Sequence, residues 1–165
     1  MKRVRSTSFV VLFACASFAG EANPVLRWQQ IIGNITAPGV NNPVAGIATG
    51  GLPWTITAGT ATVNLSTGAV AFQVQGLVLN GGNTTGTPGP VKSVMGTLVC
   101  NAGTSAQAII DTAAVPLSAQ GDAQFSGTIA GIPASCATPL FLIRMAPPLG
   151  PAWIGTGAVF TASAS

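Results

Sequence analysis

Within residues 60–79, apolar side chains alternate with polar or small ones on both sides of a turn at 66–68. After the turn, Val70, Phe72 and Val74 occupy every second position, and polar or small residues stand between them. A period of two places all apolar side chains of an extended strand on one face. The segment therefore predicts a β-hairpin with one face directed inward and the other toward water.

The rest of the chain repeats this pattern in short pieces and shows no helical stripe. Gly and Pro at 80–90 and 146–151 oppose both strand and helix, so these two stretches are expected to be loops. Regularly spaced short strands predict one all-β domain over residues 23–165, an antiparallel β-sandwich of immunoglobulin-like or jelly-roll-like type. Beyond the hairpin, the expected strands are 28–36, 44–49, 91–100, 105–111, 123–129, 140–145 and 153–160.

One segment, 140–143, is apolar on both faces, which is typical of a central strand buried on both sides. Arg144 follows directly, and its charge needs either water or a carboxylate. Asp111 and Asp122 are the two candidate partners, and the sequence leaves the choice between them open.

The first 19 residues have the organisation of a secretory signal peptide. A cationic start at Lys2, Arg3 and Arg5 precedes a short apolar run, and small residues then allow cleavage after Ala19 or as late as position 22. The apolar run is shorter than the ~20 residues that span a bilayer, so no transmembrane segment is expected. Lipid attachment at Cys15 is a lesser alternative.

The positive charge of the precursor belongs to this leader. From Gly20 onward, the cations Arg27, Lys92 and Arg144 balance the anions Glu21, Asp111 and Asp122. Without a basic patch, the chain is a poor match for nucleic acid.

Two cysteines, Cys100 and Cys136, follow the leader. An even pair in a small exported domain is best explained by one structural disulfide, since the spacing is far from that of a redox Cys-x-x-Cys motif.

Little catalytic chemistry is available. The chain has no histidine, which excludes the usual Ser-His and Cys-His systems and histidine metal sites, so no enzyme activity, metal or cofactor is expected. Asp111 and Asp122 could serve a carboxylate-dependent hydrolase, but both stand beside turn signals, where Asp commonly bonds its own backbone.

Flat aromatic rings are the remaining candidates for a binding site. Trp28, Trp54 and Trp153 could stack on sugar rings if their faces were exposed, and core packing is the alternative for each of them. Trp54 follows a Gly- and Pro-containing stretch, which favours a loop position.

The second half of the chain carries short motifs at 96–100, 115–118, 121–127, 132–136 and 141–144, followed by Trp153-Ile154. On the basis of these motifs, the stretch 91–160 resembles a group of small secreted bacterial proteins without an assigned activity. The resemblance implies a disulfide-linked β-sandwich and no catalytic residues.

Three hypotheses follow for the function. The first is an exported, secreted or periplasmic, non-catalytic binding or cell-envelope protein that contacts neutral polysaccharide through tryptophan. The second is a self-assembling surface protein, because long neutral strands are poorly protected against edge pairing. The third and weakest is the carboxylate-dependent hydrolase.

Overall fold

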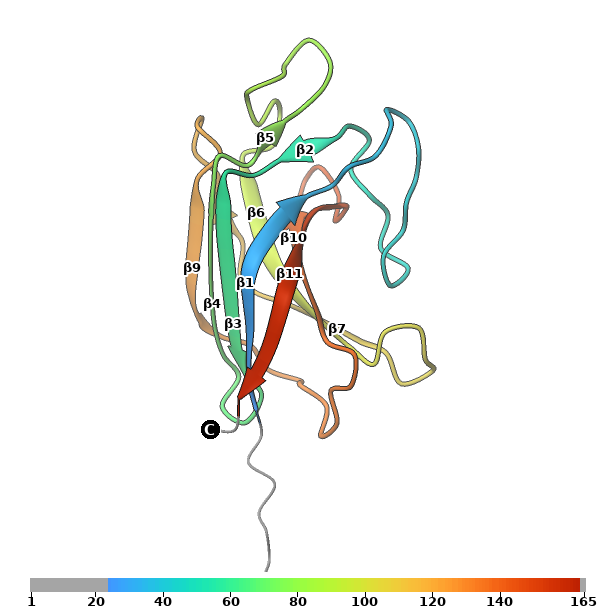
Figure 1. Ribbon diagram of the computed structural model, residues 1–165, viewed down its shortest axis with the longest axis vertical. Coiled ribbons are helices and arrows are strands. Elements are labelled where there is room, and N and C mark those ends of the chain that lie inside the picture. Colours follow the sequence, from blue (N-terminus) through green and yellow to red (C-terminus); the bar gives the residue numbers. More distant parts are fainter. Residues whose placement is uncertain (1–23, 164–165) are drawn as a thin grey trace, which may run out of the picture.

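The computed structural model describes residues 24–163. The predicted signal peptide and Cys15 lie outside this range. Within it, the chain is all-β and antiparallel, as expected (Figure 1). The strands are β1 (Val25–Gly33), β2 (Trp54–Thr55), β3 (Ala58–Asn64), β4 (Ala69–Gln75), β5 (Val78–Leu79), β6 (Ser93–Cys100), β7 (Ala108–Asp111), β8 (Val115–Pro116), β9 (Ala123–Thr128), β10 (Leu140–Met145) and β11 (Trp153–Ser163).

The predicted hairpin at 60–79 is formed by β3 and β4. Its turn is built as the sequence suggests: the Asn64 Oδ1 accepts hydrogen bonds from the backbone N–H groups of Ser66 and Thr67, at 2.9 and 3.1 Å. Gly68 closes the turn with a φ of 72°, a conformation that glycine adopts without steric cost. Local turn chemistry therefore sets the register of this pair.

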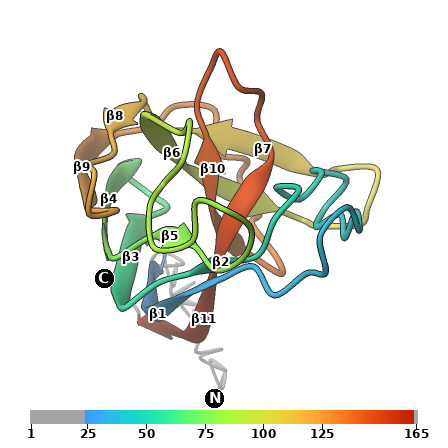
Figure 2. The same cartoon turned by 90° about the horizontal axis from the view of Figure 1, so that it is seen from above.

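Nine strands form one continuous sheet in the order β7-β6-β10-β11-β1-β3-β4-β9, with β8 also paired to β6, and β2 and β5 form a separate ribbon. Viewed from above, the strands surround a common core (Figure 2). The rings of Phe72 on β4 and Phe141 on β10 lie 6.0 Å apart, although three strands separate β4 from β10 in the sheet. The two packed layers thus belong to one sheet that curls back on itself.

The core is aromatic at its centre. Trp28 and Phe141 have ring centroids 5.4 Å apart, and Phe125 stacks on Phe72 at 5.9 Å. Gly96 lies against the rings of Phe72 and Phe141. The rings of this cluster come from strands that are far apart in the sequence, so their burial holds the curled sheet together.

The stretch 44–49 is not the strand that the sequence suggests. Ala45 and Gly46 both have positive φ values, 50° and 77°, and they reverse the chain between Val44 and Ile47. A chain reversal inside the segment prevents an extended strand, and only isolated bridges remain. The expected loops at 80–90 and 146–151 contain no strand.

The central position of 140–145 is confirmed. β10 lies between β6 and β11, and Phe141, Leu142 and Ile143 are each at most 1% exposed.

Candidate functional site

The three tryptophans are all buried. Trp28, Trp54 and Trp153 are 2%, 4% and 4% exposed. Trp28 packs in the aromatic core, and the Trp153 Nε1–H donates to the Asn42 carbonyl at 3.1 Å. A ring stacks on a sugar only through an open face, and none of these rings has one in this structure. Core packing, the alternative considered from the sequence, is what the burial supports.

Trp54 lines a hollow beside the two-stranded ribbon of β2 and β5. The hollow has a volume of about 240 Å³ and is almost wholly apolar. Its walls include Leu52, Leu79, Met145 and Leu149. It offers few hydrogen-bonding groups, which makes it a poor match for the hydroxyl groups of a sugar.

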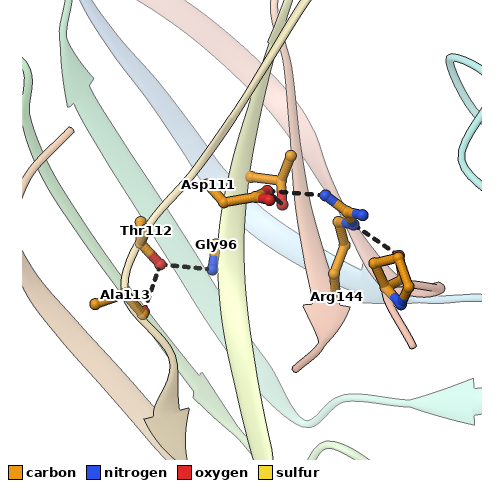
Figure 3. Close-up of polar contacts among 7 residues, drawn as sticks. Gly96, Asp111, Thr112, Ala113 and Arg144 are labelled. Atoms are coloured by element: carbon orange, nitrogen blue, oxygen red, sulfur yellow. Dashed lines mark hydrogen bonds and ion pairs between the residues drawn. The ribbon is translucent and has the colours of Figure 1, made fainter. Parts of the chain in front are cut away.

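The two candidate carboxylates have separate structural partners. Asp111 Oδ1 lies 2.8 Å from Arg144 Nη1 and accepts a 2.6 Å hydrogen bond from Thr97 (Figure 3). Asp122 Oδ1 accepts a hydrogen bond from the backbone N–H of Gly76 at 3.0 Å. Of the two partners considered for Arg144, the structure selects Asp111.

This ion pair connects three segments. Arg144 on β10 is 8% exposed in its side chain, and its Nε also donates to the Pro151 carbonyl at 2.7 Å. Asp111 lies at the end of β7 and remains 40% exposed. Next to it, Thr112 continues the pairing with β6 by accepting a hydrogen bond from the Gly96 N–H at 3.0 Å (Figure 3). These contacts connect β10, β7, β6 and the 146–151 loop.

Cys100 and Cys136 form the expected disulfide, with a Cα–Cα distance of 4.7 Å. Asn101 reinforces the same junction: its side chain donates to the Ser135 carbonyl at 2.9 Å and accepts from the Ala137 N–H at 2.9 Å. The disulfide therefore links the end of β6 to the segment that precedes β10.

Residues 24–163 hold no cluster of three or more His, Cys, Asp or Glu side chains that could bind a metal ion. The same part of the chain has no helix with the length and hydropathy to cross a bilayer.

A hollow with a volume of about 430 Å³ lies on the outer face of β3, β4 and β9. We call it the polar hollow. Uncharged side chains point into solvent there, above the buried Ala61 and Phe72. Its lining comprises Thr60, Ala61, Thr62, Ala71, Phe72, Gln73, Gln124, Phe125 and Ser126.

Strand register creates this hollow. Gln73 is paired with Thr60 on one side and with Gln124 on the other, which forms a row of three polar side chains across the strands. In the next row, Ala71 stands between Thr62 and Ser126. Ala71 is smaller than Gln73, which follows it on the same face of β4, and smaller than the paired Thr62, so the surface is lower at Ala71 and hydrogen-bonding groups stand beside it.

The sequence alone does not predict the polar hollow. The alternation at 60–79 shows which residues of β3 and β4 face outward, but nothing local indicates that β9 pairs with β4. Gln124 and Ser126 join the site only through that long-range pairing.

Residues 24–163 thus form one antiparallel all-β domain with the Cys100–Cys136 disulfide. Comparison with protein-family models, with curated proteins and with solved structures gives no significant match for the chain.

Proposed function

We propose that the protein is an exported, non-catalytic binding protein that contacts polysaccharide through the polar hollow. The observation that carries the proposal is the hollow itself, a broad depression surrounded by uncharged amide and hydroxyl groups. Sugar hydroxyls both donate and accept hydrogen bonds, and amide side chains do the same. Hydrogen bonds, rather than the stacking expected from tryptophan, supply the recognition.

The sequence and two structural features support an exported, non-catalytic role. The cationic, then apolar start of the chain has the form of a secretion signal, and a disulfide persists in an oxidising compartment. Within residues 24–163, Asp111 and Asp122 each have a separate structural partner, whereas a carboxylate-dependent hydrolase needs two carboxylates that flank one bond. A secreted or periplasmic binding role agrees with both features.

Binding of the oxidised protein to a panel of soluble neutral polysaccharides, measured by titration calorimetry, tests the proposal. The double variant Gln73→Ala/Gln124→Ala removes two amides from one row. At about 1 kcal/mol for each lost hydrogen bond, affinity should fall roughly 10- to 30-fold. Gln75→Ala is the matched control, because it alters an exposed glutamine on the same strand and outside the hollow. Equal losses in the double variant and the control would contradict the site.

Self-assembly remains a second candidate because of the edge strand β9. Its sequence, Ala123–Thr128, contains neither a charged residue nor proline, the usual protections of an exposed edge. Pairing between the β9 strands of two copies would extend the sheet. Sedimentation velocity over a wide concentration range tests this: the protein should form dimers or larger species, and Thr128→Lys should abolish them. A concentration-independent monomer would refute it.

A further inference from the structure

We propose that the site extends from the polar hollow to Arg27 and that it prefers glycans bearing a carboxylate group. This inference rests on the proposed function and adds the chemical class of the ligand. It concerns acidic sugars, whose carboxylate would meet the Arg27 guanidinium while neighbouring hydroxyl groups occupy the hollow.

The register of β1 and β3 places Arg27 beside the hollow. Arg27 is paired directly with Thr62, and Thr62 lines the hollow. Directly paired residues on one face of an antiparallel sheet have Cβ atoms about 4.5–5.5 Å apart. The row therefore continues without a break from Arg27 through Thr62 and Ala71 to Ser126.

Burial shows that the two side chains share the outer face. Leu26 and Trp28, on either side of Arg27, are each 2% exposed and point into the core, so the exposed Arg27 points outward. The same alternation applies to Thr62 between the buried Ala61 and Val63. A ligand lying across the strands in the hollow would meet Arg27 next.

The charge of Arg27 is not balanced by a carboxylate within residues 24–163. The anions of that range are Asp111 and Asp122. Asp111 forms its ion pair with Arg144, and Asp122 accepts the hydrogen bond from Gly76. Among the described residues of this face, Arg27 thus gives an otherwise uncharged surface a local positive potential, which attracts an anionic group.

A single arginine beside many neutral groups also limits the kind of anion. A nucleic acid would require several cations along its phosphates. The amides and hydroxyls of the hollow match a ligand with many hydroxyl groups and an occasional carboxylate, and a guanidinium binds a carboxylate with two parallel hydrogen bonds. An acidic glycan meets both conditions, whereas an acidic peptide offers few hydroxyls to the hollow.

Polygalacturonate and its fully methyl-esterified form provide the test, since they share a backbone and differ in charge. The oxidised protein should bind the acid form more tightly at low ionic strength, and added salt should remove the difference because it screens an exposed charge. Arg27→Gln should weaken binding of the acid form roughly three- to tenfold and leave binding of the ester unchanged. Lys92→Gln is the control, because it removes the same charge outside the polar hollow.

The outcomes separate the two proposals. If neither polymer nor any neutral polysaccharide binds, the proposed function fails and this inference fails with it. If both forms bind equally, or if Arg27→Gln keeps the preference for the acid form, only the inference fails. Binding of polyglutamate as tight as that of polygalacturonate would overturn the assignment to a sugar. Urea unfolding of Arg27→Gln should match the wild type, since the side chain is exposed.

Discussion

Gly96 on β6 lies against the Phe72 ring of β4, across the core of the curled sheet, and its replacement by alanine tests the fold. A Cβ at this position would lie 2.7 Å from Phe141 Cζ and 2.8 and 2.9 Å from Phe72 Cδ1 and Cε1. Favourable carbon contacts occur at about 3.5–4.0 Å, so both rings would have to move by roughly 0.5–1 Å. The rings belong to a close-packed aromatic cluster, which resists such a movement.

Two opposing effects determine how much Gly96→Ala changes the free energy of unfolding. Overpacking a core costs about 1–3 kcal/mol, while replacing glycine by alanine favours folding by about 0.4–1 kcal/mol through the unfolded chain. We expect Gly96→Ala to lower the free energy of unfolding by about 1–2 kcal/mol. With a slope near 2 kcal/mol per molar urea, the midpoint should fall by about 0.5–1 M.

Urea unfolding followed by tryptophan fluorescence measures this change. Gly51→Ala is the matched control, because its Cβ would meet no atom within 4 Å and its φ is not positive. The double variant Gly96→Ala/Phe72→Leu should be more stable than the sum of the single effects predicts, by at least about 0.5 kcal/mol, since a smaller side chain makes room for the new methyl group. A Gly96→Ala protein as stable as the wild type would show that the two layers do not meet at this point.

Three further predictions concern the disulfide, the ion pair and the tryptophans. Replacing Cys100 and Cys136 by alanine should lower the free energy of unfolding by about 4 kcal/mol, because the disulfide restricts the unfolded chain between two residues that are 36 apart in sequence. A loss below about 1 kcal/mol in urea unfolding would contradict that account. Asp111→Ala should lower the free energy of unfolding by about 2 kcal/mol, because it removes the carboxylate from a largely buried guanidinium. Arg144→Met should lower it by less, since this variant removes the buried charge as well; the reverse order would refute this explanation. Acrylamide should quench the fluorescence of the native protein weakly and that of the urea-unfolded protein strongly, and strong quenching of the native state would restore an exposed tryptophan face as a binding candidate.

The sequence predicts the fold where strands are long enough to show their period. β3, β4 and β10 agree with their predicted positions to within a few residues. The ribbon strands β2 and β5 contain two residues each, and a period cannot be seen in two residues. At 44–49 the composition is that of a strand, but Ala45 and Gly46 have positive φ values, and Val44 and Ile47 exchange backbone hydrogen bonds across the reversal.

The candidate site could be predicted less well, because it depends on which strands become neighbours. Tryptophan in a sequence suggests a flat surface on which a ligand could stack. Its large apolar area, however, also makes it a residue whose burial strongly stabilises a small core. Gln73, Gln124 and Arg27, in contrast, are unremarkable in their own segments. They become one surface when β4 pairs with β9 and β1 pairs with β3. In a protein with so few charged groups, that pairing determines where the cation of β1 lies relative to the polar hollow, and the proposed preference for acidic glycans depends on it.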